Sequence, residues 1–125
     1  MKRDGYVSLW VGNFVEYIDL KDYLTPFETE DGLVKRSLFE EDFMLSFYDH
    51  DQLEIEHYKQ KQSHLRDLLS FSTHHQVIVP KFVDLCGEHI PYHVNSVILL
   101  YNFQYSGRVG DEIAHIRYLG HVNYK

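Results

Sequence analysis

The chain has only one cysteine, Cys86, and three prolines among its 125 residues. A single cysteine excludes an internal disulfide framework and a CxxC redox or zinc motif, so we expect Cys86 to pack as a small apolar side chain. No stretch approaches the roughly 20 apolar residues that a membrane helix needs. The first ten residues, MKRDGYVSLW, lack the apolar region and cleavage site of a secretory signal. The sequence therefore predicts a soluble cytoplasmic protein.

Signature motifs of catalysis are also missing. The chain contains no GxSxG, no HExxH, no phosphate-binding loop and no recognisable cysteine–histidine pair. Glu54 and Glu56 resemble the carboxylate pair of a glycosidase, but an exposed strand face offers no desolvation that would shift a pKa. We therefore predict no catalytic residue, no cofactor and no enzymatic activity, and keep a small hydrolase as an alternative.

Nine histidines are many for a chain of this length, but their spacing does not suit a metal site. Adjacent His74 and His75 cannot both point at one ion from a regular element. His89 and His93 have the spacing of a helical pair, but Pro91 lies between them and interrupts the helix face that such a pair requires. We therefore predict no metal site.

The negative charge is concentrated in one third of the sequence. Residues 16–56 hold thirteen carboxylates and three bases, a net charge of −10, whereas the rest of the chain holds nine bases and six acids, a net charge of +3. Such a surface repels nucleic acid and anionic membranes and attracts a cation or a basic protein. The charge pattern therefore favours a protein partner over a nucleic acid or a membrane.

The length and the 44% hydrophobic content predict one folded domain over residues 1–125. Tyr6 to Phe14 is apolar on both faces, as expected of a central strand. A second strand is predicted from Leu53 to Tyr58, where apolar and polar residues alternate. A third is predicted from Ser96 to Tyr105, and Ile113 to Val122 is expected to pair back on it as a hairpin.

Helices are predicted between these strands. Apolar residues recur at helical spacing in residues 17–24 and in residues 33–44, where Leu38, Phe39, Phe43 and Met44 are expected to face inward. Ser63 is expected to cap a short helix. Residues 74–90 fit either a strand or a helix, and Pro80 requires such a helix to begin near Val77. The order β-α-α-β-α-α-β-β predicts an α+β fold with a mixed or antiparallel sheet of about four strands and packed helices.

The acidic segment predicts a partner-binding surface. Alternation places Glu54, Glu56 and Tyr58 on one face of their strand, and Glu40, Glu41 and Asp42 are expected on the outside of the preceding helix. Among the aromatic residues, Tyr48, Tyr58, Tyr92 and Tyr105 are expected to be exposed anchors because they lie beside polar or acidic residues. The predicted partner-binding set is Glu40, Glu41, Asp42, Tyr48, Asp49, Asp51, Glu54, Glu56 and Tyr58.

Several segments together resemble the immunity protein 22 family of bacterial polymorphic toxin systems. The two sharpest pieces are Trp10-x-Gly12-Asn13-Phe14 at the end of the first strand and Leu100-Tyr101-Asn102-Phe103-x-Tyr105 in the third. The resemblance extends over residues 6–124 and is weaker in residues 26–37 and 73–93.

This resemblance implies a small cytoplasmic antidote that binds a cognate toxin domain and blocks it. The acidic surface favours a basic nuclease as the toxin, because nucleases must hold phosphates. An acidic adaptor for some other basic protein remains an alternative, and the sequence leaves the oligomeric state open.

Overall fold

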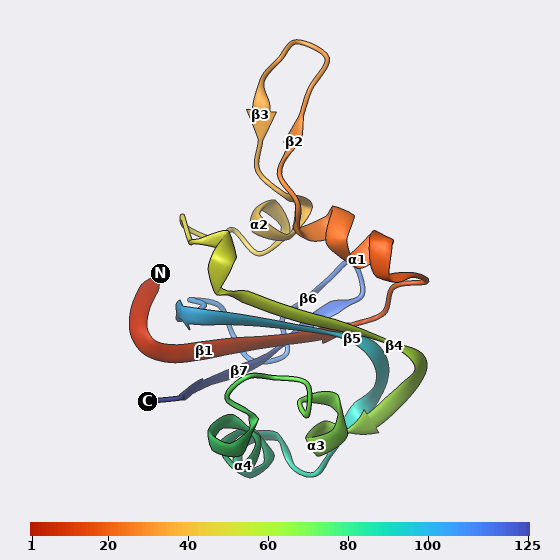
Figure 1. Cartoon of the computed structure of the whole chain (residues 1–125), viewed down its shortest axis with the longest axis vertical. Helices are drawn as coiled ribbons and strands as arrows, with labels where there is room; N and C mark the ends of the chain where they lie inside the picture. The colour runs from red at the N-terminus through yellow and green to blue at the C-terminus, as the bar shows by residue number, and fades with distance from the viewer.

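The sheet is the centre of the structure. The computed structural model describes residues 1–125 and contains a curled five-stranded sheet of order β4-β5-β1-β7-β6 (Figure 1). Its strands are β1 (Lys2–Gly12), β4 (Leu53–His64), β5 (His89–Phe103), β6 (Glu112–Ile113) and β7 (Ile116–Asn123). All neighbouring strands are antiparallel. The predicted α+β class is confirmed, but the sheet has five strands rather than about four.

Strand β1 occupies the middle of the sheet, as its apolar sequence predicts. It pairs with β5 on one side and with β7 on the other. The expected hairpin between the third and last strands is wrong, because β1 lies between β5 and β7. Gly12 is required where β7 crosses, since a Cβ there would collide with the Ile116 side chain and the His115 carbonyl.

The two faces of the sheet are covered by different elements (Figure 1). We call them the α1/α2 layer and the α3/α4 layer. The α1/α2 layer contains α1 (Tyr17–Leu24), a projecting hairpin of β2 (Phe27–Glu28) and β3 (Val34–Lys35), and α2 (Leu38–Asp42). The α3/α4 layer contains α3 (Leu65–Leu68) and α4 (His75–Cys86), and a 3-10 turn, η1 (His50–Gln52), precedes β4.

Each layer has its own hydrophobic core. The core under the α3/α4 layer has fifteen buried residues, nearly all aliphatic, including Val7, Leu9 and Val11 of β1. The core under the α1/α2 layer has fourteen, of which eight are aromatic, and Trp10 lies among them. Trp10 packs edge-on against Phe39, with ring centroids 4.9 Å apart. The strict alternation of β1 therefore supplies both cores.

Asn102 changes which face the residues of β5 supply. Its φ of +58° is in the left-handed region, and the pairing of β1 with β5 shifts beside it. Tyr101 belongs to the α3/α4 core, whereas Phe103 belongs to the α1/α2 core. Asn102 is held by its side chain, which accepts hydrogen bonds from Gly5 N at 3.0 Å and from the Tyr124 hydroxyl at 2.7 Å.

The predicted helix over residues 33–44 is mostly wrong. Val34 and Lys35 belong to strand β3, and α2 begins only at Leu38. Leu38 and Met44, which were expected to face inward, are exposed. Ser37 explains the late start, because its side chain accepts a hydrogen bond from Glu40 N and caps the helix.

Of residues 74–90, which fit either element by sequence, His75–Cys86 form helix α4 and the last two residues begin strand β5. The helix begins at His75, two residues earlier than Pro80 was expected to allow, so the proline lies in its second turn. Ile78, Val79 and Phe82 are buried against the sheet. Burial of these side chains compensates for the backbone hydrogen bond that the proline cannot donate.

Candidate protein-binding surface

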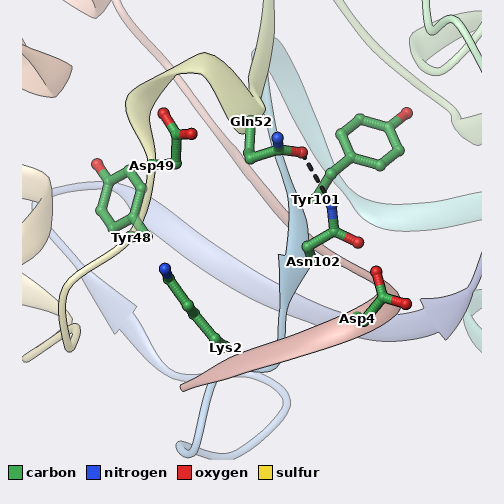
Figure 2. A pocket seen from close by; sticks show the side chains of 7 residues that line it. All are labelled: Lys2, Asp4, Tyr48, Asp49, Gln52, Tyr101 and Asn102. Carbon is green, nitrogen blue, oxygen red and sulfur yellow. Dashed lines mark hydrogen bonds between the residues drawn. The ribbon is translucent and has the colours of Figure 1, made fainter.

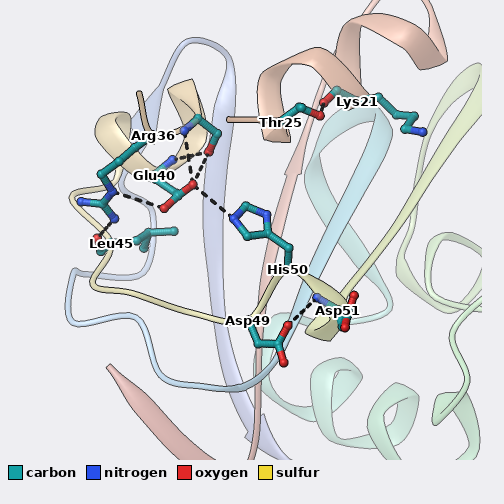
Figure 3. Close-up of polar contacts among 9 residues, drawn as sticks. Lys21, Thr25, Arg36, Glu40, Leu45, Asp49, His50 and Asp51 are labelled. Carbon is teal, nitrogen blue, oxygen red and sulfur yellow. Dashed lines mark hydrogen bonds and ion pairs between the residues drawn. The ribbon is translucent and has the colours of Figure 1, made fainter. Parts of the chain in front are cut away.

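Glu40 belongs to the predicted outer acidic face, but the structure buries it (Figure 3). Its carboxylate accepts hydrogen bonds from Arg36 Nε at 3.2 Å and from the Ser37 backbone and hydroxyl at 3.2 and 3.1 Å. His50 Nε2 lies 3.5 Å away, and Arg36 also donates to the Leu45 carbonyl. Glu40 is only 6% exposed, so the expectation of an outward-facing side chain is wrong. Its charge is paired within the chain.

The sequence contains a signal for this arrangement. Ser37 and Glu40 form a capping box, in which each side chain binds the backbone N–H of the other residue. The spacing Ser-x-x-Glu before Phe43 is typical of a helix N-terminus. This signal, rather than the apolar periodicity, identifies the start of α2.

The predicted acidic strand is confirmed in its alternation but not in its exposure. Glu54 and Tyr58 face the α3/α4 layer and are half-buried. The Glu54 carboxylate accepts hydrogen bonds from Tyr101 Oη at 2.7 Å and from Thr73 N at 3.1 Å. Tyr58 donates its hydroxyl to the Leu68 carbonyl at 2.9 Å. These two side chains therefore join β4 to the α3/α4 layer.

The other predicted acids differ in their exposure and in their hydrogen bonds within the chain. Glu41, Asp49 and Asp51 are exposed, although Asp49 also caps η1 by accepting from Asp51 N at 2.9 Å. Asp42 is half-buried and accepts a hydrogen bond from the Tyr23 hydroxyl. Glu56 is half-buried on β4. The predicted set is thus divided between the two layers and does not form one continuous face.

Two of the four tyrosines expected to be exposed are buried. Tyr48 is 3% exposed, and Tyr105 lies in the α1/α2 core. Burial and a hydrogen bond to Asp111 raise the pKa of Tyr105 to about 12. Tyr92 is half-buried under the Arg117 guanidinium, 4.0 Å from the ring centroid. The expectation for Tyr48 and Tyr105 is wrong, because both rings pack in the aromatic α1/α2 core.

Exposed apolar side chains gather instead on the α1/α2 layer, which the sequence did not reveal. Nine of the fourteen large apolar residues that are exposed in the chain fall between residues 15 and 47. They are Val15, Tyr17, Ile18, Phe27, Leu33, Val34, Leu38, Met44 and Phe47. Exposed apolar residues that cluster in this way mark protein–protein contact surfaces.

The hairpin within this layer is well defined. Thr29 N donates to the Leu33 carbonyl at 2.8 Å, and Leu33 N donates back to the Thr29 hydroxyl at 3.2 Å. Gly32 allows the turn with a φ of +79°. Glu28, Glu30 and Asp31 are exposed around this turn. The hairpin therefore presents an acidic tip.

A cavity of about 400 Å³ lies at the base of the hairpin. Its apolar wall comes from Pro26, Val34 and Phe47, and Glu40 and Tyr48 contribute polar atoms. The Tyr48 hydroxyl is buried without a hydrogen-bond partner. Burial and the nearby Glu40 carboxylate hold the pKa of Tyr48 well above its usual range.

A second cavity, of about 260 Å³, is also lined by Tyr48 (Figure 2). Lys2 and Asp4 line it from β1, and Gln52 accepts a hydrogen bond from the Asn102 side chain at 3.0 Å. No nucleophile lies beside a base in this cavity. Its polar groups serve to join η1 to β5.

The arrangement of the side chains suits binding more than chemistry. No three histidine, cysteine or carboxylate side chains gather closely enough to hold a metal ion. No helix is long and apolar enough to cross a membrane. The feature that stands out is the group of exposed apolar side chains on the α1/α2 layer.

Comparison with known proteins identifies the family. No curated protein and no solved structure matches the chain. Residues 7–125 match the family described as Immunity protein 22, which confirms the resemblance seen in the sequence. Because this match spans nearly the whole chain, the protein belongs to the immunity protein 22 family.

Proposed function

We propose that this protein binds a cognate bacterial toxin domain and neutralises it by occluding its active surface. Membership of the immunity protein 22 family over residues 7–125 is the observation that carries the proposal. The exposed apolar and acidic α1/α2 layer supports it, because a stoichiometric inhibitor needs a surface that is available in the free protein.

The charge distribution favours a basic nuclease as the toxin. A nuclease must hold phosphates and therefore carries a basic surface. Residues 16–56 carry a net charge of −10, which attracts such a surface and speeds its association by electrostatic steering. If the toxin cleaves intracellular nucleic acid, the antidote meets it in the cytoplasm.

We propose Glu41, Asp49 and Asp51 as direct contacts among the nine residues predicted from sequence. Their side chains are exposed and have no basic partner in the chain. Asp42 and Glu56 are half-buried beside them in sequence and add to the field. Of the remaining members, Glu40 and Tyr48 support the α1/α2 layer from inside the fold, whereas Glu54 and Tyr58 join β4 to the α3/α4 layer.

Titration against the toxin domain encoded beside this gene, at low and at high salt, tests the proposal together with a cell-survival assay. We expect one-to-one binding that weakens as salt rises, and survival of cells that express both proteins. No binding and no survival would leave the alternative of an acidic adaptor for another partner. Tight binding that is indifferent to salt would retain the antidote and exclude the electrostatic mechanism.

A charge-reversal pair locates the electrostatic contribution. Glu41→Lys with Asp51→Lys should slow association by about tenfold at low salt, because steering depends on these exposed charges. Asp84→Lys is the matched control, since Asp84 is an exposed acid of α4, which lies across the sheet from α2 (Figure 1). Equal association rates for the two proteins would show that Glu41 and Asp51 lie outside the interface.

A further inference from the structure

We infer that the toxin docks on the α1/α2 layer, with the β2–β3 hairpin as the central contact and the cavity at its base as the anchor site. This inference rests on the proposed function and identifies the surface that performs it. The partner that fits is a protein with a basic cleft and an apolar side chain at the edge of that cleft.

The hairpin exposes apolar side chains that the fold does not use. Phe27 and Leu33 are about half exposed, and Val34 is 77% exposed. Strands β2 and β3 pair only with each other, and the arm projects away from the sheet (Figure 1). An arm whose apolar residues contribute nothing to either core is explained by contact with another protein.

The charge at the tip selects the partner. Glu28, Glu30 and Asp31 surround the turn, and Lys35 is the only base within residues 27–35. None of these three carboxylates makes an ion pair within the chain. A basic cleft that holds phosphates complements this tip in both sign and shape, whereas an acidic or neutral surface does not.

The cavity at the base of the hairpin supplies an independent observation. Buried polar groups are nearly always hydrogen-bonded in folded proteins, yet the Tyr48 hydroxyl has no partner. It lies beside Glu40 and Arg36, and both residues line this cavity. The hydroxyl is buried in the free protein, so a polar atom from the partner would satisfy it after a shift of the Tyr48 ring toward the cavity.

The walls of the cavity indicate what enters it. Pro26, Val34 and Phe47 are apolar, and Phe47 is 78% exposed at the rim. A cavity of about 400 Å³ accommodates one large side chain. A tyrosine or a similar side chain with an apolar body and a polar end fits both the walls and the unpaired hydroxyl, and such side chains are common binding anchors.

The hairpin is pre-organised in the free protein. The hydrogen bonds between Thr29 and Leu33 fix its turn, and Arg36 and Glu40 fix its base through their ion pair. A contact element that is ordered in the free protein loses less conformational entropy on association. The fixed turn and base therefore favour tight binding.

Three variants test the inference against the toxin domain encoded beside this gene. Leu33→Ser with Val34→Ser removes apolar surface without changing charge, and Glu30→Lys with Asp31→Lys reverses the tip. We expect each pair to weaken binding at least tenfold and to leave Tm nearly unchanged, because these side chains are exposed. Val77→Ser is the matched control, since Val77 is exposed on α4, and it should bind as tightly as the wild type.

Tyr48→Phe tests the cavity separately. Because the hydroxyl has no partner in the free protein, its removal should leave Tm equal or raise it, while binding weakens by about fivefold. A merely structural tyrosine would show the opposite pattern, with a lower Tm and unchanged affinity. That result would exclude the cavity as an anchor.

The outcomes separate this inference from the proposed function. If the wild type binds and protects cells but both hairpin pairs bind equally well, the function stands and the docking surface is wrong. If the wild type neither binds nor protects, both fail. Dimerisation of the free protein that Leu33→Ser with Val34→Ser abolishes would assign the surface to a second copy of the chain and would overturn the inference.

Discussion

The two layers that cover the sheet use their residues differently. On the α3/α4 side, a twelve-residue helix covers an aliphatic core, and its exposed large apolar residues are Val77 and Leu85. On the α1/α2 side, helices of eight and five residues cover an aromatic core, and nine large apolar residues of residues 15–47 remain exposed. One layer is nearly complete as a fold, whereas the other keeps apolar surface in contact with solvent.

If the α1/α2 layer is the docking surface that we infer, one sheet supports stability on one face and binding on the other. Large aromatic rings such as Trp10 bury much surface per residue, so a small layer suffices to close the core. Residues 27–35 are then free to project away from the sheet (Figure 1). Perturbing the residues of one layer and measuring the response of the other tests this difference between them.

High pH should produce the largest difference in stability between the two layers. Burial raises the pKa of Tyr118 to about 12 and, together with the Asp111 hydrogen bond, that of Tyr105 to about 12. Burial also holds the pKa of Tyr23 and Tyr48 above the usual range, and all four rings lie in the α1/α2 core. In the unfolded chain these tyrosines ionise near pH 10, so the stability that their protonated forms provide should be lost as pH rises from about 10 to 12.

Trp10 is the single tryptophan and lies in the same core, so its near-ultraviolet signal reports on the α1/α2 layer. We expect this signal to disappear at lower pH than the far-ultraviolet signal of the helices. The α3/α4 core has one tyrosine, Tyr101, whose pKa is raised by burial and by its hydrogen bond to Glu54. Coincident transitions would mean that the two layers unfold as one unit.

Truncation of each core should be the next largest effect. Phe39 and Phe82 are fully buried, one in each layer, and either change to alanine should reduce the free energy of unfolding by about 3–5 kcal/mol. Urea unfolding measures this loss. At temperatures where both variants are folded, Phe39→Ala should also weaken toxin binding, because α2 supports the cavity, whereas Phe82→Ala should not. Equal binding losses would remove the functional distinction between the layers.

The buried carboxylate of α2 should have an intermediate effect. Glu40→Gln leaves the Arg36 guanidinium without its partner, so we expect a loss of about 1–3 kcal/mol in the free energy of unfolding. Glu41→Gln, at an exposed position, should change stability by less than about 0.5 kcal/mol. Thermal unfolding distinguishes them. Comparable values for the two would place Glu40 at the surface, as the sequence suggested.

The smallest effect should be a gain in stability. Met44 follows α2 with a φ of +51° and is 86% exposed. Glycine adopts this conformation without strain, so Met44→Gly should raise the free energy of unfolding by about 0.5–1 kcal/mol. It should weaken toxin binding, because the exposed methionine is lost from the α1/α2 layer.

Asn102→Gly is the control for Met44→Gly, because it makes the same change at a second residue with positive φ. Asn102 has a similar φ of +58°, but its side chain binds Gly5, Gln52 and Tyr124. Its replacement should therefore lower stability. If Met44→Gly lowers stability as well, the methionine has a structural role that its exposure does not suggest.

Sequence patterns predicted the parts of the fold that local physics decides. Strand β1, helix α1 and the alternation of β4 follow from periodicity over a few residues. The pairing of β7 was mispredicted, because adjacency along the chain suggested a hairpin with β5, whereas β1 inserts between them. Long-range pairing of this kind leaves no local signal.

The exposed surface of the α1/α2 layer was harder to predict than the fold. Leu38 and Met44 belong to a segment whose apolar residues predicted an inward-facing stripe, and periodicity cannot distinguish a stripe that packs on a core from one that is exposed. The charge of residues 16–56 was correct as a count, but Glu40 and Glu54 are engaged within the chain. Among the residues that carry the family resemblance, Trp10, Gly12 and Asn102 have structural roles. The resemblance therefore identified the family without locating the interface.

The central position of β1 has a consequence for how the protein folds. Strand β1 ends at Gly12, but its two partners, β5 and β7, lie within residues 89–123. The sheet therefore closes only through contacts between residues far apart in sequence, and contacts of such high sequence separation form slowly. A chain that lacks β7 would leave one side of β1 unpaired, so we expect its sheet to stay open and its β1 to be accessible to other strands.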